Sequence, residues 1–406
     1  MAGETSHGVG VFLELRKRLQ TGLLVVGTNV AKSPADVVLS GGDSSLCVRT
    51  PRGDLCLSLP AGVAYESGSC LHTPVVQFSE EELHFRLRIK MDRIQQEDPA
   101  SMMETLRTKE TYSFHCQGCT TRLLEDRVFK RVLPLPNGNW NALVDDWCCH
   151  PDPFAKKLLP RAEDCLLGDT FVLLARDGSC DQTLIEEVTP VGAADSQDQK
   201  KPCHRLALIS CASCSLVLGE AVAPGTLKLY ITQVVVDPAV GDGRPDASLN
   251  RSAFLETSVA ARLLNLSNSL SSFHFSVQTP GGKVFLLLWL LNGDSIIASV
   301  PEKSVGDESS ISPPAPPRPS LRAARALKLL YISCSSASIQ QREIVASWEA
   351  NCIGHPVVLP MKACEELLQV MEESNSKLPA SMHRMRSYEV AYLRLTSEGE
   401  SKPFCL

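Results

Sequence analysis

The chain has 406 residues, with 40 basic and 46 acidic side chains and a formal net charge of -6. This length permits two or three domains and a core large enough to fold without a partner. The slightly acidic balance disfavours a nucleic-acid-binding protein, whose binding face carries clustered Lys and Arg. The most apolar run, residues 284–291, is far shorter than the roughly 20 residues that cross a bilayer, so we expect no membrane span.

The first ten residues lack a positively charged segment followed by an apolar one, so we expect no secretion signal. We therefore predict an intracellular protein, located in the cytoplasm with the nucleus as a second compartment. In such a reducing environment the 16 cysteines are expected to be thiols, metal ligands or nucleophiles rather than disulfides. Cys47, Cys56 and Cys70 lie in alternating apolar patterns, which predicts small buried side chains.

Strand-length apolar or alternating runs, separated by Gly and Pro turns, dominate the first part of the chain. We interpret residues 1–110 as a β-rich N-terminal module. Residues 111–240 contain further strand patterns, two Cys-x-x-Cys motifs and the run Trp-Cys-Cys-His-Pro-Asp-Pro-Phe at 147–154. This second part is predicted to be a zinc-binding β module.

The pattern changes in residues 241–406. An apolar stripe predicts a long helix over 252–270, and a hairpin is expected to turn at Pro280-Gly281-Gly282. A Pro-rich excursion covers 301–320, and a second helix is expected from about 361 to 373. We therefore predict a mixed α/β C-terminal part. The fold class is mainly β or α+β, with zinc-braced antiparallel sheets.

The two Cys-x-x-Cys motifs are Cys116-Gln-Gly-Cys119 and Cys211-Ala-Ser-Cys214. Each motif directs two sulfurs toward one point, and two motifs complete the tetrahedral sulfur set of a zinc ion. All four ligands would be protein atoms, so the zinc would be structural, without an open position. The alternatives are a redox dithiol, which needs a strand-to-helix setting that neither motif has, or ordinary buried thiols. We predict a shared zinc site.

Cys148, Cys149 and His150 allow three interpretations. One thiol, with Cys149 as the candidate, would be a nucleophile whose pKa is lowered by His150. Alternatively, the flanking prolines fix a rigid turn whose aromatic side chains fill a gap in the core. The third interpretation is a second zinc site completed by more distant residues, namely Cys165 with Cys203 or His204.

The Trp-Cys-Cys-His-Pro-Asp-Pro-Phe run, with nearly the whole chain around it, resembles the HECT-like ubiquitin-protein ligases that bind a mitotic ubiquitin-conjugating enzyme. The resemblance implies a protein that accepts ubiquitin as a thioester, transfers it to substrate lysines and modifies itself. Its implied partners are the conjugating enzyme, ubiquitin and a protein substrate such as a cell-cycle regulator. Because ATP is consumed upstream, this activity needs no phosphate-binding loop, and the sequence contains none.

Residues 359–368 (Leu-Pro-Met-Lys-Ala-Cys-Glu-Glu-Leu-Leu) resemble the stretch around the ubiquitin-accepting cysteine of HECT ligases, which implies that Cys364 is the nucleophile. The Leu-Pro pair stands one residue closer to the cysteine than in HECT domains, and no threonine precedes the cysteine, so the similarity is local. A helix N-terminus would favour the thiolate. His355 or His383 would assist if the fold brings either one close.

The opposing interpretation is that Cys364 belongs to the core. It shares a helical stripe with Leu367, Leu368 and Met371, and cysteines in such stripes are mostly buried side chains. On that view the protein is a non-enzymatic, zinc-stabilised adaptor or folding partner that binds other proteins.

Overall fold

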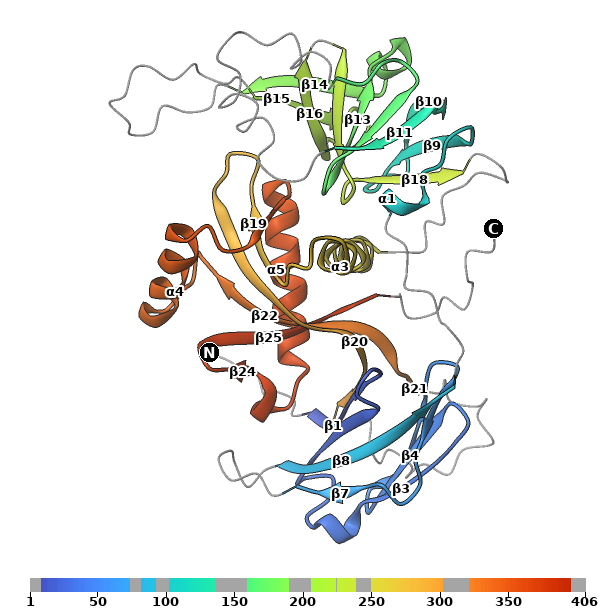
Figure 1. Ribbon diagram of the computed structural model, residues 1–406, viewed down its shortest axis with the longest axis vertical. Coiled ribbons are helices and arrows are strands. Elements are labelled where there is room, and N and C mark those ends of the chain that lie inside the picture. The colour runs from blue at the N-terminus through green and yellow to red at the C-terminus, as the bar shows by residue number, and fades with distance from the viewer. Residues whose placement is uncertain are drawn as a thin grey trace. The chain divides into compact units, whose positions relative to one another are not determined.

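The computed structural model describes eight stretches of the chain: residues 9–73, 82–92, 102–135, 159–189, 206–223, 225–238, 250–301 and 321–395. Strands predominate in these stretches (Figure 1) and most of them pair antiparallel, which confirms the mainly β or α+β fold class. Among the helices of these stretches, none is both long and apolar enough to cross a membrane. The predictions for Cys148, Cys149, His150, Cys203 and His204 lie outside the described residues.

The chain forms two compact units, each assembled from separate segments. The first unit comprises Met1–Pro99, Leu287–Cys352 and Leu368–Leu406, and the second comprises Ala100–Leu286 and Ile353–Leu367. The three consecutive modules expected from the sequence stay a prediction.

The principal sheet of the first unit has the strand order β24-β25-β22-β20-β1-β2-β8-β6, and β7 pairs with β8. The second sheet has the order β21-β5-β4-β3. The strands of the two sheets are β1 (Val9–Arg16), β2 (Thr21–Gly27), β3 (Val38–Gly42), β4 (Ser45–Thr50), β5 (Gly53–Ser58), β6 (Val63–Tyr65), β7 (Leu71–His72), β8 (Glu82–Met91), β20 (Val284–Pro301), β21 (Leu321–Arg322), β22 (Ala324–Ser333), β24 (Arg384–Met385) and β25 (Tyr388–Arg394). The helices are η1 (Pro34–Asp36), α4 (Ile339–Ala350) and η5 (Ala380–Met382).

Both faces of the principal sheet are buried around β1. Leu13 and Leu15 belong to one apolar cluster, whereas Phe12, the residue before Leu13, packs in another cluster with Tyr392. Successive side chains of a strand point to opposite faces, so the continuous apolar run from Val11 supplies two cores at once. This explains why the N-terminal strand lacks polar alternation at these positions.

The expectation that Cys47 and Cys56 are small buried thiols is wrong. They are directly opposed on β4 and β5, and a disulfide joins them. Their face of the sheet is the outward one: Cys56 is exposed and Cys47 is half-buried, and the ion pair between Arg49 and Asp54 joins the same two strands. The apolar neighbours of the cysteines along each strand point to the opposite face, which is why the alternating pattern was misinterpreted.

The second unit contains a three-stranded sheet, β10-β9-β18, and a seven-stranded sheet, β11-β12-β13-β17-β16-β15-β14. A short parallel pair joins β19 and β23. The strands are β9 (Thr111–Cys116), β10 (Arg122–Val128), β11 (Arg131–Pro134), β12 (Asp164–Leu167), β13 (Phe171–Ala175), β14 (Leu184–Thr189), β15 (Leu206–Cys211), β16 (Val217–Ala223), β17 (Thr226–Tyr230), β18 (Val234–Pro238), β19 (His274–Gln278) and β23 (His355–Val358). The helices are α1 (Met102–Thr105), η3 (Gly178–Asp181), α3 (Arg251–Leu270) and the first part of α5 (Met361–Ser376).

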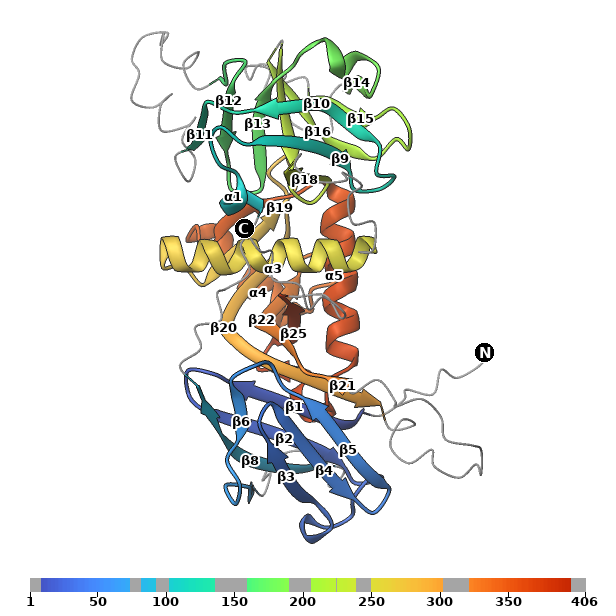
Figure 2. The ribbon, with the colours of Figure 1, turned by 90° about the vertical axis from the view of Figure 1, so that its right-hand side faces the viewer.

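Helix α3, shown in yellow in Figure 2, confirms the helix predicted over 252–270. Asn250 caps its N-terminus, since the side-chain Oδ1 accepts a hydrogen bond from the Ala253 amide at 2.8 Å. Leu255, Val259 and Leu263 are buried, as the apolar stripe indicated. The predicted turn at 280–282 is also present between β19 and β20, closed by a 2.8 Å hydrogen bond from the Gly282 amide to the Thr279 carbonyl.

Candidate functional site

The two Cys-x-x-Cys motifs form turns of the same shape. Cys116 ends β9 and Cys211 ends β15. In each turn the amide four residues after the first cysteine donates to that cysteine's carbonyl at 2.8 Å. The donors, Thr120 and Ser215, have positive φ angles of 58° and 60°. Each strand therefore ends in its own tight turn, and the two cysteine sulfurs of that turn lie on the same side.

The two turns bring their sulfurs together. The ligand atoms of Cys116, Cys119, Cys211 and Cys214 all lie within 4.8 Å of one another. The Sγ atoms of Cys116 and Cys214 are 3.6 Å apart, and those of Cys119 and Cys211 are 3.7 Å apart. Tetrahedral sulfurs bonded to zinc at about 2.3 Å stand about 3.8 Å from each other. This cluster, called the four-cysteine centre below, can therefore hold a metal ion.

The thiols of the four-cysteine centre differ in acidity. Burial raises the pKa of Cys116. Cys214 is exposed, and partial desolvation together with hydrogen bonds to the thiols of Cys119 and Cys211 raises its pKa. Burial acts on Cys119 as well, but hydrogen bonds with Thr121 and with neighbouring thiols outweigh it and lower the pKa of Cys119 to about 6. One thiolate at neutral pH, surrounded by three more sulfurs, is a favourable start for binding a divalent cation, which requires deprotonated ligands.

Gly118 lies close to the second turn, and its own φ angle is not positive. A Cβ at this position would lie 3.5 Å from the Cys214 sulfur and 3.3 Å from a methyl of Leu216. The left-handed residues of the two turns are Thr120 and Ser215 instead, which the sequence pattern did not lead us to expect. Each residue stands four positions after the first cysteine of its motif. This equal spacing was the sequence signal that could have indicated the shape of the turns.

Cys364 lies in the first turn of α5 and is fully buried, with 0% of its surface exposed. Its Sγ contacts the Leu359 carbonyl oxygen at 3.6 Å. Burial raises the pKa of Cys364 to about 12, and the charge of Glu365 adds to the rise. Leu367 and Met371 on the same stripe are also fully buried. The role of Cys364 as a nucleophile stays a prediction, and it requires an exposed, more acidic thiol than this one.

The two histidines considered as helpers have other partners. The Nε2 atom of His355 lies 2.7 Å from Asp169 Oδ2, and the ring packs edge-on against Phe275. The Nε2 atom of His383 lies 2.9 Å from the Leu378 carbonyl oxygen. Cys165, considered as a ligand of a second zinc site, is buried in β12, where burial raises its pKa to about 12.

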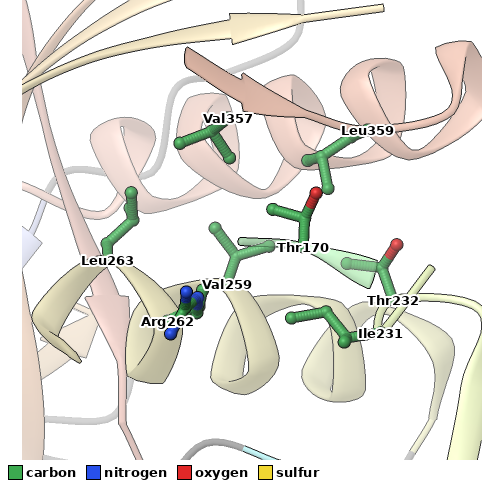
Figure 3. A pocket seen from close by; sticks show the side chains of 8 residues that line it. All are labelled: Thr170, Ile231, Thr232, Val259, Arg262, Leu263, Val357 and Leu359. Carbon is green, nitrogen blue, oxygen red and sulfur yellow. The ribbon is translucent and has the colours of Figure 1, made fainter. Parts of the chain in front are cut away.

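A small hollow lies between α3 and the end of β23 (Figure 3). Its volume is about 10 Å³, enough for about one water molecule. Arg262 reaches it from α3 and pairs with Asp169 at 3.2 Å. The side chains that line the hollow are Thr170, Ile231, Thr232, Val259, Arg262, Leu263, Val357 and Leu359. This hollow is too small for a peptide or a cofactor, so its residues serve packing.

Comparison with known proteins gives a consistent result. The model of a family described as HECT-like ubiquitin-conjugating enzyme (E2)-binding matches residues 14–390. An E3 ubiquitin-protein ligase of Mus musculus is 36% identical over 393 residues, which cover 95% of this chain and 98% of the relative. The protein of the same name from Homo sapiens is 34% identical over 392 residues, with 95% and 98% covered. That from Bos taurus is 35% identical over 398 residues, with the same coverage. No solved structure matches the chain.

Proposed function

The chain belongs to the family of HECT-like proteins that bind ubiquitin-conjugating enzymes, and we propose that it acts as an E3 ubiquitin-protein ligase. The observation that carries the proposal is the family match over residues 14–390. Relatives named as E3 ubiquitin-protein ligases cover almost the same length. The partner that this family description implies is a ubiquitin-conjugating enzyme, and the proposed sites of action are the cytoplasm and the nucleus.

The proposed reaction has two steps. A cysteine thiolate attacks the carbonyl carbon of the thioester that joins ubiquitin to the conjugating enzyme, and the enzyme's own cysteine leaves as a thiolate. The amine of a substrate lysine then attacks the new thioester and forms an isopeptide bond with ubiquitin. The cysteine of this chain that carried ubiquitin leaves as a thiolate. Transfer to a lysine of this chain would be self-ubiquitination. Cys364 is the proposed acceptor, because its surroundings resemble the HECT pattern, and Cys149 is the second candidate.

For the four-cysteine centre we propose a structural zinc ion, held by Cys116, Cys119, Cys211 and Cys214. The sulfur spacing of 3.6 and 3.7 Å fits a tetrahedral thiolate site. With four protein ligands the ion has no position for substrate, so its role is to hold β9 and β15 together.

The second candidate function is a non-enzymatic adaptor that holds a conjugating enzyme near a substrate. The complete burial of Cys364 and the rise of its pKa to about 12 favour this alternative. Here ubiquitin would pass directly from the conjugating enzyme to the lysine.

A single-turnover assay with a ubiquitin-charged conjugating enzyme separates the two functions. If Cys364 accepts ubiquitin, Cys364→Ser forms an oxyester that survives reductant, and Cys364→Ala forms no adduct. Cys149→Ala is tested in parallel. If both alanine variants keep their fold and transfer ubiquitin at the rate of the unchanged protein, neither cysteine is the acceptor. If the unchanged protein then also forms no reductant-sensitive adduct with ubiquitin, the thioester mechanism is wrong and the adaptor is supported. If the unchanged protein accelerates no transfer, the ligase proposal fails.

A further inference from the structure

Arg251, at the start of α3, connects three segments of the second unit that are distant in sequence. Its Nη1 donates to the side-chain oxygen of Gln117 at 3.1 Å and also to the carbonyl oxygen of Thr232. Its Nε donates to Glu366 Oε2 at 2.8 Å. The side chains of Arg251 and Glu366 are each only 24% exposed. The guanidinium therefore satisfies acceptors from a turn, a loop and a helix at once.

The first of these segments is a turn of the four-cysteine centre. Gln117 stands between Cys116 and Cys119. Its backbone amide donates to the backbone carbonyl of Gln233 at 3.1 Å. When both cysteines bind a metal, the backbone between them has little freedom, and so the position of the Gln117 side chain is fixed as well.

The second segment is the part of α5 that carries Cys364. Glu366 follows that cysteine by two residues, in the same unit as Arg251 and Gln117. The planar guanidinium holds its Nε and Nη1 bonds in a fixed relative direction. A partly buried, hydrogen-bonded ion pair resists solvent screening better than an exposed pair. The geometry therefore gives a short, rigid path from the metal ligands to the first turns of α5.

We propose that Arg251 is a positioning residue that couples metal binding at the four-cysteine centre to the order of α5 around Cys364. The relevance of this coupling to ubiquitin transfer rests on the function proposed above. When the metal leaves, the Cys116–Cys119 turn loosens and Nη1 keeps the Thr232 carbonyl but loses Gln117 as a fixed acceptor. Glu366 then has a less rigid partner. The amides of residues 364–367 then open more often.

Hydrogen exchange of the full chain tests the coupling, with zinc as the probe and a chelator to remove it. In the unchanged protein, chelation is expected to speed exchange at residues 364–367 roughly tenfold, a usual size for coupling between two sites. Three variants interrupt the path: Gln117→Ala removes its first contact, Glu366→Gln removes the charge of its last, and Arg251→Gln removes the guanidinium that joins them. In each of them chelation is expected to change exchange at 364–367 less than about twofold, while zinc content stays at that of the unchanged protein.

Arg251→Lys sharpens the test, because a lysine can pair with Glu366 but lacks the planar fork that also holds Gln117. It is expected to keep the melting temperature within a few degrees and still to lose most of the zinc dependence. The matched control is Arg176→Gln. Arg176 is 25% exposed and is likewise paired with a carboxylate, Glu186, but its ion pairs join it to β14 and η3 rather than to α5. This control is expected to keep the tenfold response.

Two results would overturn the coupling: an unchanged response in Arg251→Gln protein that holds zinc normally, or no zinc-dependent exchange at 364–367 in the unchanged protein. The thiolate absorption bands of cobalt-substituted Gln117→Ala protein are expected to match those of the unchanged protein, because Gln117 is not one of the four ligands. Exchange is measured without ubiquitin. Failure of the ligase assay therefore leaves this result intact, and failure of the coupling leaves the ligase assay intact.

Discussion

Among the described residues of the second unit, the four-cysteine centre and Cys364 place cysteines in contrasting surroundings. In the four-cysteine centre, sulfurs from two turns lie 3.6–3.7 Å apart, and the pKa of Cys119 falls to about 6. Cys364 instead shares its helix face with buried apolar side chains, its sulfur meets a carbonyl oxygen, and its pKa rises to about 12. The difference teaches that burial alone does not decide the chemistry of a thiol. Hydrogen bonds and neighbouring sulfurs decide whether the thiol loses its proton at neutral pH.

The largest expected effect is at the metal ligands. Cys116→Ser should remove most of the bound zinc and lower the melting temperature sharply, because binding of a structural zinc contributes roughly 10 kcal/mol or more in small domains. Metal analysis and thermal unfolding check this. Cys180→Ser is the matched control, since Cys180 is fully buried in the same core cluster and belongs to none of the predicted metal sites. Equal zinc content in both variants would rule out the ligand assignment.

A smaller but still large effect concerns reactivity. The rise of the Cys364 pKa from 9.0 to about 12 lowers its thiolate fraction at neutral pH about a thousandfold. Iodoacetamide should therefore alkylate Cys364 in the folded protein at least about a thousandfold more slowly than it alkylates an exposed thiol. Cys352, which is exposed, is the internal reference. Mass spectrometry of digested protein gives both rates. Comparable rates would mean that Cys364 opens readily to solvent, as a nucleophile must.

The smallest expected effect is on stability along α5. Leu367→Ala should cost about 2–5 kcal/mol of unfolding free energy, because it removes a fully buried side chain. Cys364→Ala removes one heavy atom and should cost about 1 kcal/mol. The exposed Glu365→Ala should stay within about 0.5 kcal/mol of the unchanged protein. Denaturant titrations measure all three. A stabilising Cys364→Ala would point to a thiol kept for function at the expense of packing.

Local patterns carried much of the prediction. The helix at 251–270, the turn at 280–282 and the burial of Leu367 and Met371 follow from periodicity and from Gly and Pro positions. The clustering of the two Cys-x-x-Cys motifs follows from their internal spacing, which is typical of metal-binding turns. In each case the information lies within a few residues of the chain, which is why one sequence suffices.

Long-range relations could not be predicted in the same way. Nothing near Arg251 in sequence indicates that it will meet Gln117 and Glu366, because such contacts depend on how strands pair over long separations. The disulfide between Cys47 and Cys56 depends on the register of two strands. A shift by one residue would place the cysteines on opposite faces.

The pairing of β1 with β20 has a consequence for biosynthesis. Leu13, near the start of the chain, lies opposite Ala298, and the same sheet is completed by β25 close to the end. The emerging N-terminal strands therefore leave the ribosome long before their neighbour is translated, and during that interval β1 presents an open, apolar edge. A message truncated before residue 284 would yield a polypeptide that cannot close this edge, and such a product is expected to be retained by chaperones and degraded.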